Sequence, residues 1–119
     1  MKLLFDSNIV IGVLNDTVSP SALALIQNAN PLAISIMTWM EVMVGATKET
    51  ESATRDFLSR FLVYELDQAI AEQAVVYRRT LRLKLPDAII YATARVQART
   101  LVTLNVRDYP GGTDSVLVP

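Results

Sequence analysis

The sequence contains no cysteine and no histidine, and these two absences remove a large part of the usual catalytic repertoire. They exclude a disulfide framework, a zinc finger, any imidazole-ligated metal, and nucleophiles of the Cys–His or Ser–His type. Any chemistry must therefore use carboxylates, hydroxyls, amides and cations. A metal site would have oxygen ligands only, which suits Mg²⁺ or Mn²⁺ better than zinc.

A large excess of charge of either sign is also missing. The chain has 11 Lys and Arg against 12 Asp and Glu, so no global field attracts it to nucleic acid or to an anionic membrane. Binding of a polyanion would need a local basic patch. No apolar run approaches the roughly 20 residues of a membrane span, and the stretch before Asp6 is too short for the apolar core of a signal peptide. We therefore expect a soluble, cytoplasmic protein that does not contact a membrane.

The chain does have the length of one domain and many apolar residues. It has 119 residues, of which 51% are hydrophobic, and a single core supports roughly 100 to 150 residues. We expect one domain over residues 1–119. The mean hydropathy of +0.32 is high for a small soluble monomer. Because a large exposed apolar surface normally marks an interaction site, this composition indicates a buried partner surface.

Short apolar runs alternate with helical patterns along the chain. Strands are expected at 2–5, 32–36, 63–66, 100–104 and 116–118, and helices at 9–14, 21–28, 38–46, 50–62, 68–83 and 88–97. Caps, prolines and glycines separate these segments. The alternation predicts an α/β fold with a mainly parallel sheet and right-handed crossovers.

Polar side chains occur where the expected strands lead into helices or turns. Asp6 and Glu41 follow the first two strands, and Asn105 and Asp108 follow the strand at 100–104. Asp87 lies at the start of an apolar helix, whose dipole favours an ionised carboxylate. The carboxyl ends of parallel strands share one edge of the sheet, where ligands bind. Crowded carboxylates raise each other's pKa unless a cation lies among them, so this pattern is typical of an Mg²⁺ or Mn²⁺ site.

Each acid also has an ordinary structural interpretation. Asp6 and Asp87 suit helix caps. Glu41 suits a capping box of the T-x-x-E type, and Asp108 suits a turn. Only their joint placement in one alternating fold favours a common site.

Four segments of the chain resemble a known family. They are LFDSNIVI at 4–11, MEVMVG at 40–45, LPDAIIYATA at 85–94 and LVTLNVRDY at 101–109. In this order and at this spacing they are similar to the four sequence blocks of PIN-domain ribonucleases, and in particular of VapC-type toxins from bacterial toxin–antitoxin pairs. The resemblance covers nearly the whole chain and is far more specific than a single short motif.

The resemblance implies a three-layer α/β/α domain that holds Mg²⁺ or Mn²⁺ on acidic residues and cleaves RNA phosphodiester bonds. Carried over by position, the three metal-binding acids are Asp6, Glu41 and Asp87. The fourth catalytic position falls on Asp108 or on Asn105, because Asn105 stands where many members have an acid and brings no charge. This departure puts a second metal in doubt. Asn105 and three neighbours are expected to orient ligands or water; these neighbours are Ser7, Asn8 and Thr103.

RNA must still be drawn to an acidic site, and nearby cations are the expected means. The best candidates by position are Arg82, Lys84 and Arg107. The resemblance also implies a homodimer and a cognate antitoxin protein whose segment lies in an apolar groove beside the acids. Two apolar segments are candidates for that surface, namely Leu14, Val18, Leu23 and Ile26 in the first and Trp39, Met40, Met43 and Val44 in the second.

Two other functions remain open. A catalytically silent PIN-like binding module is suggested by Asn105 alone. A carboxylate-based phosphotransfer domain would also group acids at a sheet edge, but it needs paired acids and a late lysine, and the last lysine here is Lys84.

Overall fold

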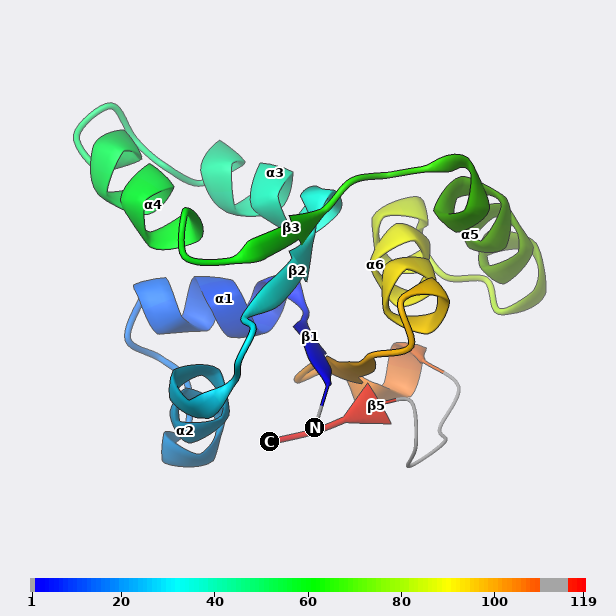
Figure 1. Cartoon of the computed structure of the whole chain (residues 1–119), viewed down its shortest axis with the longest axis horizontal. Helices are drawn as coiled ribbons and strands as arrows, with labels where there is room; N and C mark the ends of the chain where they lie inside the picture. Colours follow the sequence, from blue (N-terminus) through cyan, green and yellow to red (C-terminus); the bar gives the residue numbers. More distant parts are fainter. Residues whose placement is uncertain (1, 110–115) are drawn as a thin grey trace.

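The computed structural model describes residues 2–109, apart from the side chain of Val106, and residues 116–119. Strands and helices alternate along this part of the chain (Figure 1). The elements are β1 Leu3–Phe5, α1 Ser7–Leu14, α2 Pro20–Asn28, β2 Ala33–Ser35, α3 Ile36–Val44, α4 Glu51–Leu58, β3 Leu62–Tyr64, α5 Gln68–Thr80, α6 Leu85–Val96, β4 Thr100–Val102, the 3₁₀ turn η1 Val106–Asp108 and β5 Val116–Leu117.

Every strand pair in the described residues is parallel. β1 pairs with β4 and β4 pairs with β5, so that these three strands form a sheet in the order β1-β4-β5. β2 and β3 form a second parallel pair. β1 also lies beside β2, which brings the two ladders into one central layer (Figure 1). The predicted α/β class with a parallel sheet is confirmed.

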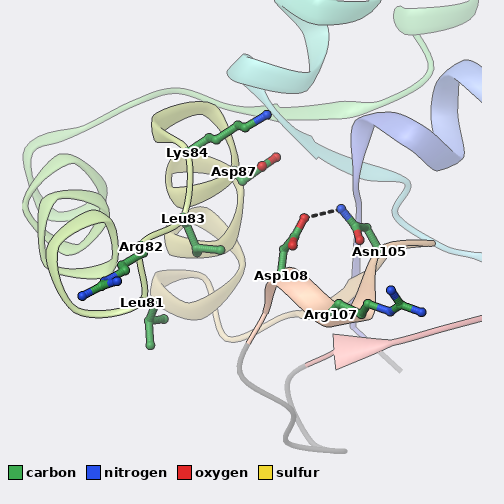
Figure 2. Close-up of a pocket in the computed structure, with 8 residues that line it drawn as sticks. All are labelled: Leu81, Arg82, Leu83, Lys84, Asp87, Asn105, Arg107 and Asp108. Carbon is green, nitrogen blue, oxygen red and sulfur yellow. Dashed lines mark hydrogen bonds between the residues drawn. The ribbon is translucent and has the colours of Figure 1, made fainter.

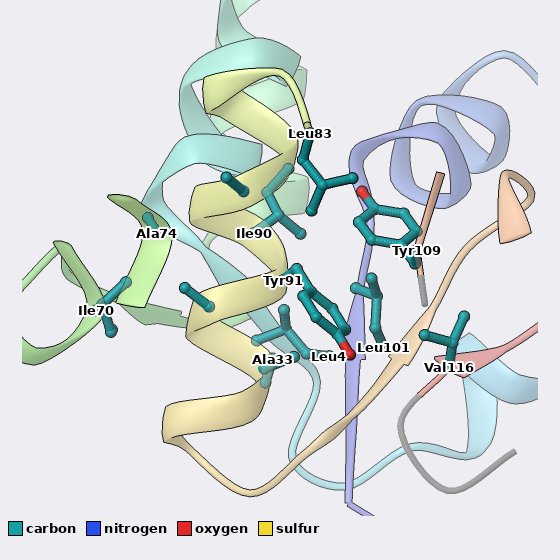
Figure 3. Packing of buried hydrophobic residues seen from close by; sticks show 13 residues of the cluster. Leu4, Ala33, Ile70, Ala74, Leu83, Ile90, Tyr91, Leu101, Tyr109 and Val116 are labelled. Atoms are coloured by element: carbon teal, nitrogen blue, oxygen red, sulfur yellow. The ribbon is translucent and has the colours of Figure 1, made fainter. Parts of the chain in front are cut away.

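Alternate residues of the central strands face opposite helical layers, as the two-residue period of a strand requires. Leu4 and Leu101 belong to a cluster with the buried faces of α5 and α6 (Figure 3). Phe5 and Val102, their neighbours in sequence, belong to a second cluster with the buried faces of α1 to α4. The chain is therefore a three-layer α/β/α arrangement, and it places the ends of β1 and β4 next to each other.

Helix starts differ from the sequence expectation at two places that matter for the acids. α3 begins at Ile36 because the Ser35 hydroxyl caps it by accepting from the Met37 amide at 3.0 Å. The capping box expected for Glu41 is therefore wrong, and Glu41 lies in the body of α3. α6 begins at Leu85, so Asp87 sits in its first turn and does not act as the N-cap.

The residues expected at the partner surface are only partly exposed. Ile26 is buried, and three of the other side chains pack against the second core cluster, namely Leu23, Trp39 and Met43. Because these residues complete the core, they cannot serve mainly as a docking surface. The most exposed of the expected residues are Leu14, Met40 and Val44, with exposed fractions of 41%, 45% and 85%. None of the described helices is both long enough and apolar enough to span a membrane.

Candidate acidic site

Asp6 lies at the end of β1 and caps α1. Its Oδ1 accepts from the Ser7 amide at 2.7 Å, and its Oδ2 accepts from the Thr103 hydroxyl at 2.7 Å and from the Tyr109 hydroxyl at 3.3 Å. The residue is only 4% exposed. Burial raises the pKa of Asp6 above its ordinary value, and the nearby charge of Asp87 raises it further, although the three hydrogen bonds act in the opposite direction. Asp6 is therefore a fixed but electrostatically costly carboxylate.

Thr103 connects the loop after β4 to the start of α1. Its hydroxyl accepts from Asn8 Nδ2 at 3.2 Å and from the Asn105 amide at 3.0 Å, and it donates to Asp6. Asn8 Oδ1 in turn accepts from the Leu104 amide at 3.2 Å. These bonds use the donor and both lone pairs of the Thr103 hydroxyl. Asn8 and Thr103 thus hold Asp6 and the loop after β4 in a fixed relative position.

Glu41 reaches the same region from α3. The Ser7 hydroxyl donates to Glu41 Oε1 at 2.6 Å and lies 3.1 Å from the hydroxyl of Thr38, which is buried one turn earlier on α3. Ser7 is itself in the first turn of α1, directly after Asp6. One serine therefore fixes the position of Glu41 relative to Asp6.

Asp87 interacts electrostatically with each of the other acids at the site. Burial is the largest cause that raises its pKa, followed by the charges of Glu41 and Asp108, while the charge of Lys84 and the nearby hydroxyl of Tyr109 lower it. Asp87 also raises the pKa of Asp6. Asp87 of α6 therefore interacts electrostatically with three other acids, which are Asp6 at the N-cap of α1, Glu41 of α3 and Asp108 of η1.

Asp108 and Asn105 form a pair across the 3₁₀ turn. Asn105 Nδ2 donates to Asp108 Oδ2, and both residues are exposed (Figure 2). The two candidates for the fourth position are thus in direct contact, and the carboxylate of the pair is the one that acts on Asp87.

A pocket of about 350 Å³ lies beside these acids. It is lined by Leu81, Arg82, Leu83, Lys84, Asp87, Asn105, Arg107 and Asp108. Figure 2 shows the Lys84 side chain alongside Asp87, whereas the guanidinium groups of Arg82 and Arg107 point away from the two acids. All three predicted cations therefore line the pocket. Of the three, Lys84 is the one whose side chain lies toward an acid, Asp87.

No three of these acids form a ready-made ion site in the part of the chain that the structure describes. The assignment of Asp6, Glu41 and Asp87 to one Mg²⁺ and its waters therefore stays a prediction. The donor set still fits Mg²⁺ or Mn²⁺, because all its atoms are oxygens and because Mg²⁺ usually binds through one or two carboxylates and keeps several waters. Within the same residues, the two salt bridges join Arg55 to Glu51 and Arg60 to Asp56, so no protein cation is ion-paired with the four acids.

Tyr109 is the site residue that the sequence analysis missed. It follows Asp108 and precedes a proline, and in sequence it reads as part of a turn. In the structure it is 4% exposed, and its hydroxyl reaches Asp6, which lies at the other end of the chain. Its one signal in the sequence was its place within the fourth resembling segment.

Known proteins share this fold over nearly the full chain. The family model described as PIN domain matches residues 3–107. Ribonuclease VapC10 of Mycobacterium tuberculosis is 33% identical over 114 residues, which cover 91% of this chain and 86% of that protein. A toxin–antitoxin complex from Klebsiella pneumoniae contains a chain that is 43% identical, with a TM-score of 0.85 and coverage of 97% of this chain and 95% of the other. The crystal structure of VapBC2 from Rickettsia felis shares the fold with a TM-score of 0.80 at 22% identity, covering 99% and 98%.

The four resembling segments carry Asp6, Glu41, Asp87 and Asp108, and the family model spans the whole of this stretch except Asp108 and Tyr109. With a VapC relative at 33% identity over most of its length, the chain belongs to the PIN-domain family, in its VapC branch.

Proposed function

We propose that this protein is an endoribonuclease that requires Mg²⁺ or Mn²⁺ and acts as the toxin of a toxin–antitoxin pair. The observation that carries the proposal is the group of four acids without an ion-paired protein cation. Burial and mutual repulsion raise the pKa of Asp6 and of Asp87. A structural carboxylate that is paired with a protein cation has a lowered pKa, and the hydrogen bonds to Asp6 do not offset its burial, so this arrangement is best explained by a cation that binds in function. The VapC relative named as a ribonuclease supports the same activity.

In this proposal Asp6, Glu41 and Asp87 hold the metal, and Asp108 lies beside Asp87 as the fourth acid. When bound, the metal supplies an activated water and stabilises the charge that develops at the phosphate during an in-line displacement. No covalent intermediate with the protein is needed. The protein's own contribution is orientation: Ser7 fixes Glu41, and Thr103 and Tyr109 fix Asp6.

RNA binding depends on cations at the pocket. Lys84 lies alongside Asp87 and lowers its pKa, so it is placed to contact a phosphate next to the scissile bond. Arg82 and Arg107 line the same pocket with their guanidinium groups turned outward. We therefore assign Lys84 to the reacting phosphate, and Arg82 and Arg107 to phosphates further along the RNA.

The antitoxin is assigned to a second groove. About 420 Å³ in volume, it runs between α1, α3 and α4, and its lining includes Ile11, Leu14, Val42 and Glu41. Because Glu41 is part of both the groove and the acidic site, a protein segment bound there could reach the acids and block them. The Klebsiella pneumoniae structure is titled a toxin–antitoxin complex, which supports a partner of this kind. We also propose that the protein is a homodimer.

The experiment that tests the activity uses purified protein and a mixed RNA substrate, with Mg²⁺, Mn²⁺ or EDTA. The expected result is cleavage by the wild type with either metal, none with EDTA, and none by Asp87→Asn. Metal titration of the same protein separates the alternative. A silent binding module would neither bind the metal nor cleave, and RNA binding without either property would favour that module.

A further inference from the structure

The Tyr109 hydroxyl is a buried donor at one of the proposed metal-binding acids. It lies 3.3 Å from Asp6 Oδ2 and donates to it. Asp6 follows β1 in the central layer, whereas Asp87, whose charge acts on both Asp6 and Tyr109, is in the first turn of α6 in an outer layer. A phenol has one hydrogen and donates it to one acceptor at a time, so Asp6 takes the single donor that Tyr109 offers.

Packing fixes the Tyr109 ring independently of its hydroxyl. The ring centroid lies 5.4 Å from that of Tyr91, which in turn lies 4.8 Å from that of Tyr77. Figure 3 shows the Tyr109 hydroxyl at the Leu83 end of the cluster, whereas the Tyr91 hydroxyl points toward the opposite end. A phenylalanine would fill the same apolar space. The hydroxyl is therefore not needed for packing and must be explained by Asp6, the acid to which it donates.

A neutral donor suits this place better than a cation would. An arginine or lysine paired with Asp6 and Asp87 would hold them together, but it would also neutralise the charge that attracts a metal ion. The Tyr109 hydroxyl orients Asp6 and leaves the charges of Asp6 and Asp87 in place. Burial, together with the charges of Asp6, Asp87 and Asp108, raises the pKa of Tyr109, so the phenol keeps its proton at neutral pH and remains a donor.

From this geometry we infer that Tyr109 is a positioning residue whose hydroxyl holds Asp6 in place beside Asp87 for one divalent cation. The inference rests on the proposed function. It predicts that removal of the hydroxyl weakens metal binding while the fold remains, because Asp6 would then be free to turn away from Asp87. Groups that orient metal ligands typically change metal affinity by roughly 10- to 100-fold.

The test is isothermal titration of Mn²⁺ into metal-free wild type, Tyr109→Phe and Tyr91→Phe, in the absence of RNA. Tyr91→Phe is the matched control, because it removes a hydroxyl from the same aromatic stack that points away from the acids. We expect Mn²⁺ to bind Tyr109→Phe about tenfold more weakly than wild type, and to bind Tyr91→Phe as wild type does. Excess Mn²⁺ should then restore RNA cleavage by Tyr109→Phe.

Equal or tighter binding of Mn²⁺ by Tyr109→Phe would overturn the inference and leave the proposed function intact. A Tyr109→Phe protein that unfolds without metal would also overturn it, because the hydroxyl would then be a structural group. Absence of Mn²⁺ binding by wild type would instead refute the proposed function, and the inference with it.

Discussion

The Ser7 hydroxyl donates a 2.6 Å hydrogen bond to Oε1 of Glu41 and so ties the first turn of α1 to the middle of α3. Ser7→Ala removes this bond and leaves Glu41 free to swing away from Asp6. We expect RNA cleavage to fall about tenfold, the lower end of the range for residues that orient metal ligands. The free energy of unfolding should fall by about 1 kcal/mol, the usual net value of one hydrogen bond. Cleavage assays and urea denaturation measure the two effects.

Ser19 provides the control for that variant. Its hydroxyl caps α2 by accepting from the Ala22 amide at 3.2 Å, and α2 carries none of the four acids. Ser19→Ala should also lose about 1 kcal/mol of stability, but it should cleave RNA at the wild-type rate. Equal losses of activity in the two variants would mean that Ser7 acts only through stability.

The acids should differ in importance. Asp87→Asn removes a proposed metal ligand at nearly constant volume, so cleavage should fall by more than about a hundredfold, the upper limit for residues outside the ligand set. Asp108→Asn should cost less, because Asp108 is exposed and is held by Asn105 at the rim of the pocket. Initial rates at saturating Mg²⁺ give the comparison. Equal losses at both positions would make Asp108 a direct metal ligand.

Local sequence patterns were enough for the fold and for part of the site. The alternation of apolar runs with helical patterns predicted the class, and the carboxyl-edge rule of parallel sheets placed Asp6, Glu41, Asn105 and Asp108 at one edge. Asp87 was added because it stands at the start of an apolar helix, which is also a local pattern. Contacts between distant segments could not be obtained in this way. Tyr109 meets Asp6 across the whole chain, and no local pattern encodes that pair. Likewise, the environment of Trp39 on α3 depends on α4, because the Arg55 guanidinium carbon lies over the Trp39 ring, 5.7 Å from its centre.

The raised pKa of Asp87 implies a stability that depends on pH. Burial, with help from Glu41 and Asp108, makes the folded chain hold this proton to a higher pH than the unfolded chain, whose ordinary pKa is 3.8. Below that value Asp87 is protonated in both states and has no effect. As the pH rises from 3.8 through the raised pKa of folded Asp87, the free energy of unfolding decreases. It stays lower at neutral pH.

Asp87→Asn should therefore be more stable than wild type at pH 7 in EDTA, with the difference shrinking toward pH 4. Urea denaturation across this range measures it, and Glu49→Gln, a change at an exposed acid outside the site, serves as control. Saturating Mg²⁺ should stabilise wild type more than Asp87→Asn, because a ligand that binds only the folded state adds its binding free energy. A difference independent of pH would contradict the electrostatic explanation.

The antitoxin surface should respond to changes at exposed residues of α3 and not to changes at its buried ones. Val44 is 85% exposed at the end of α3, beside the groove that contains Glu41. When the protein is produced together with the product of its neighbouring reading frame, Val44→Asp should reduce the antitoxin retained on purification about tenfold or more, since a charge at an apolar interface is costly to desolvate. Val96→Asp, at a half-exposed valine on α6, is the control and should retain the partner.

Trp39→Ala should mainly lower stability, because its ring packs against the second core cluster. Light scattering of the Val44→Asp, Val96→Asp and Trp39→Ala variants at micromolar concentration should show dimers. Undiminished retention by Val44→Asp would place the antitoxin on another face of the molecule.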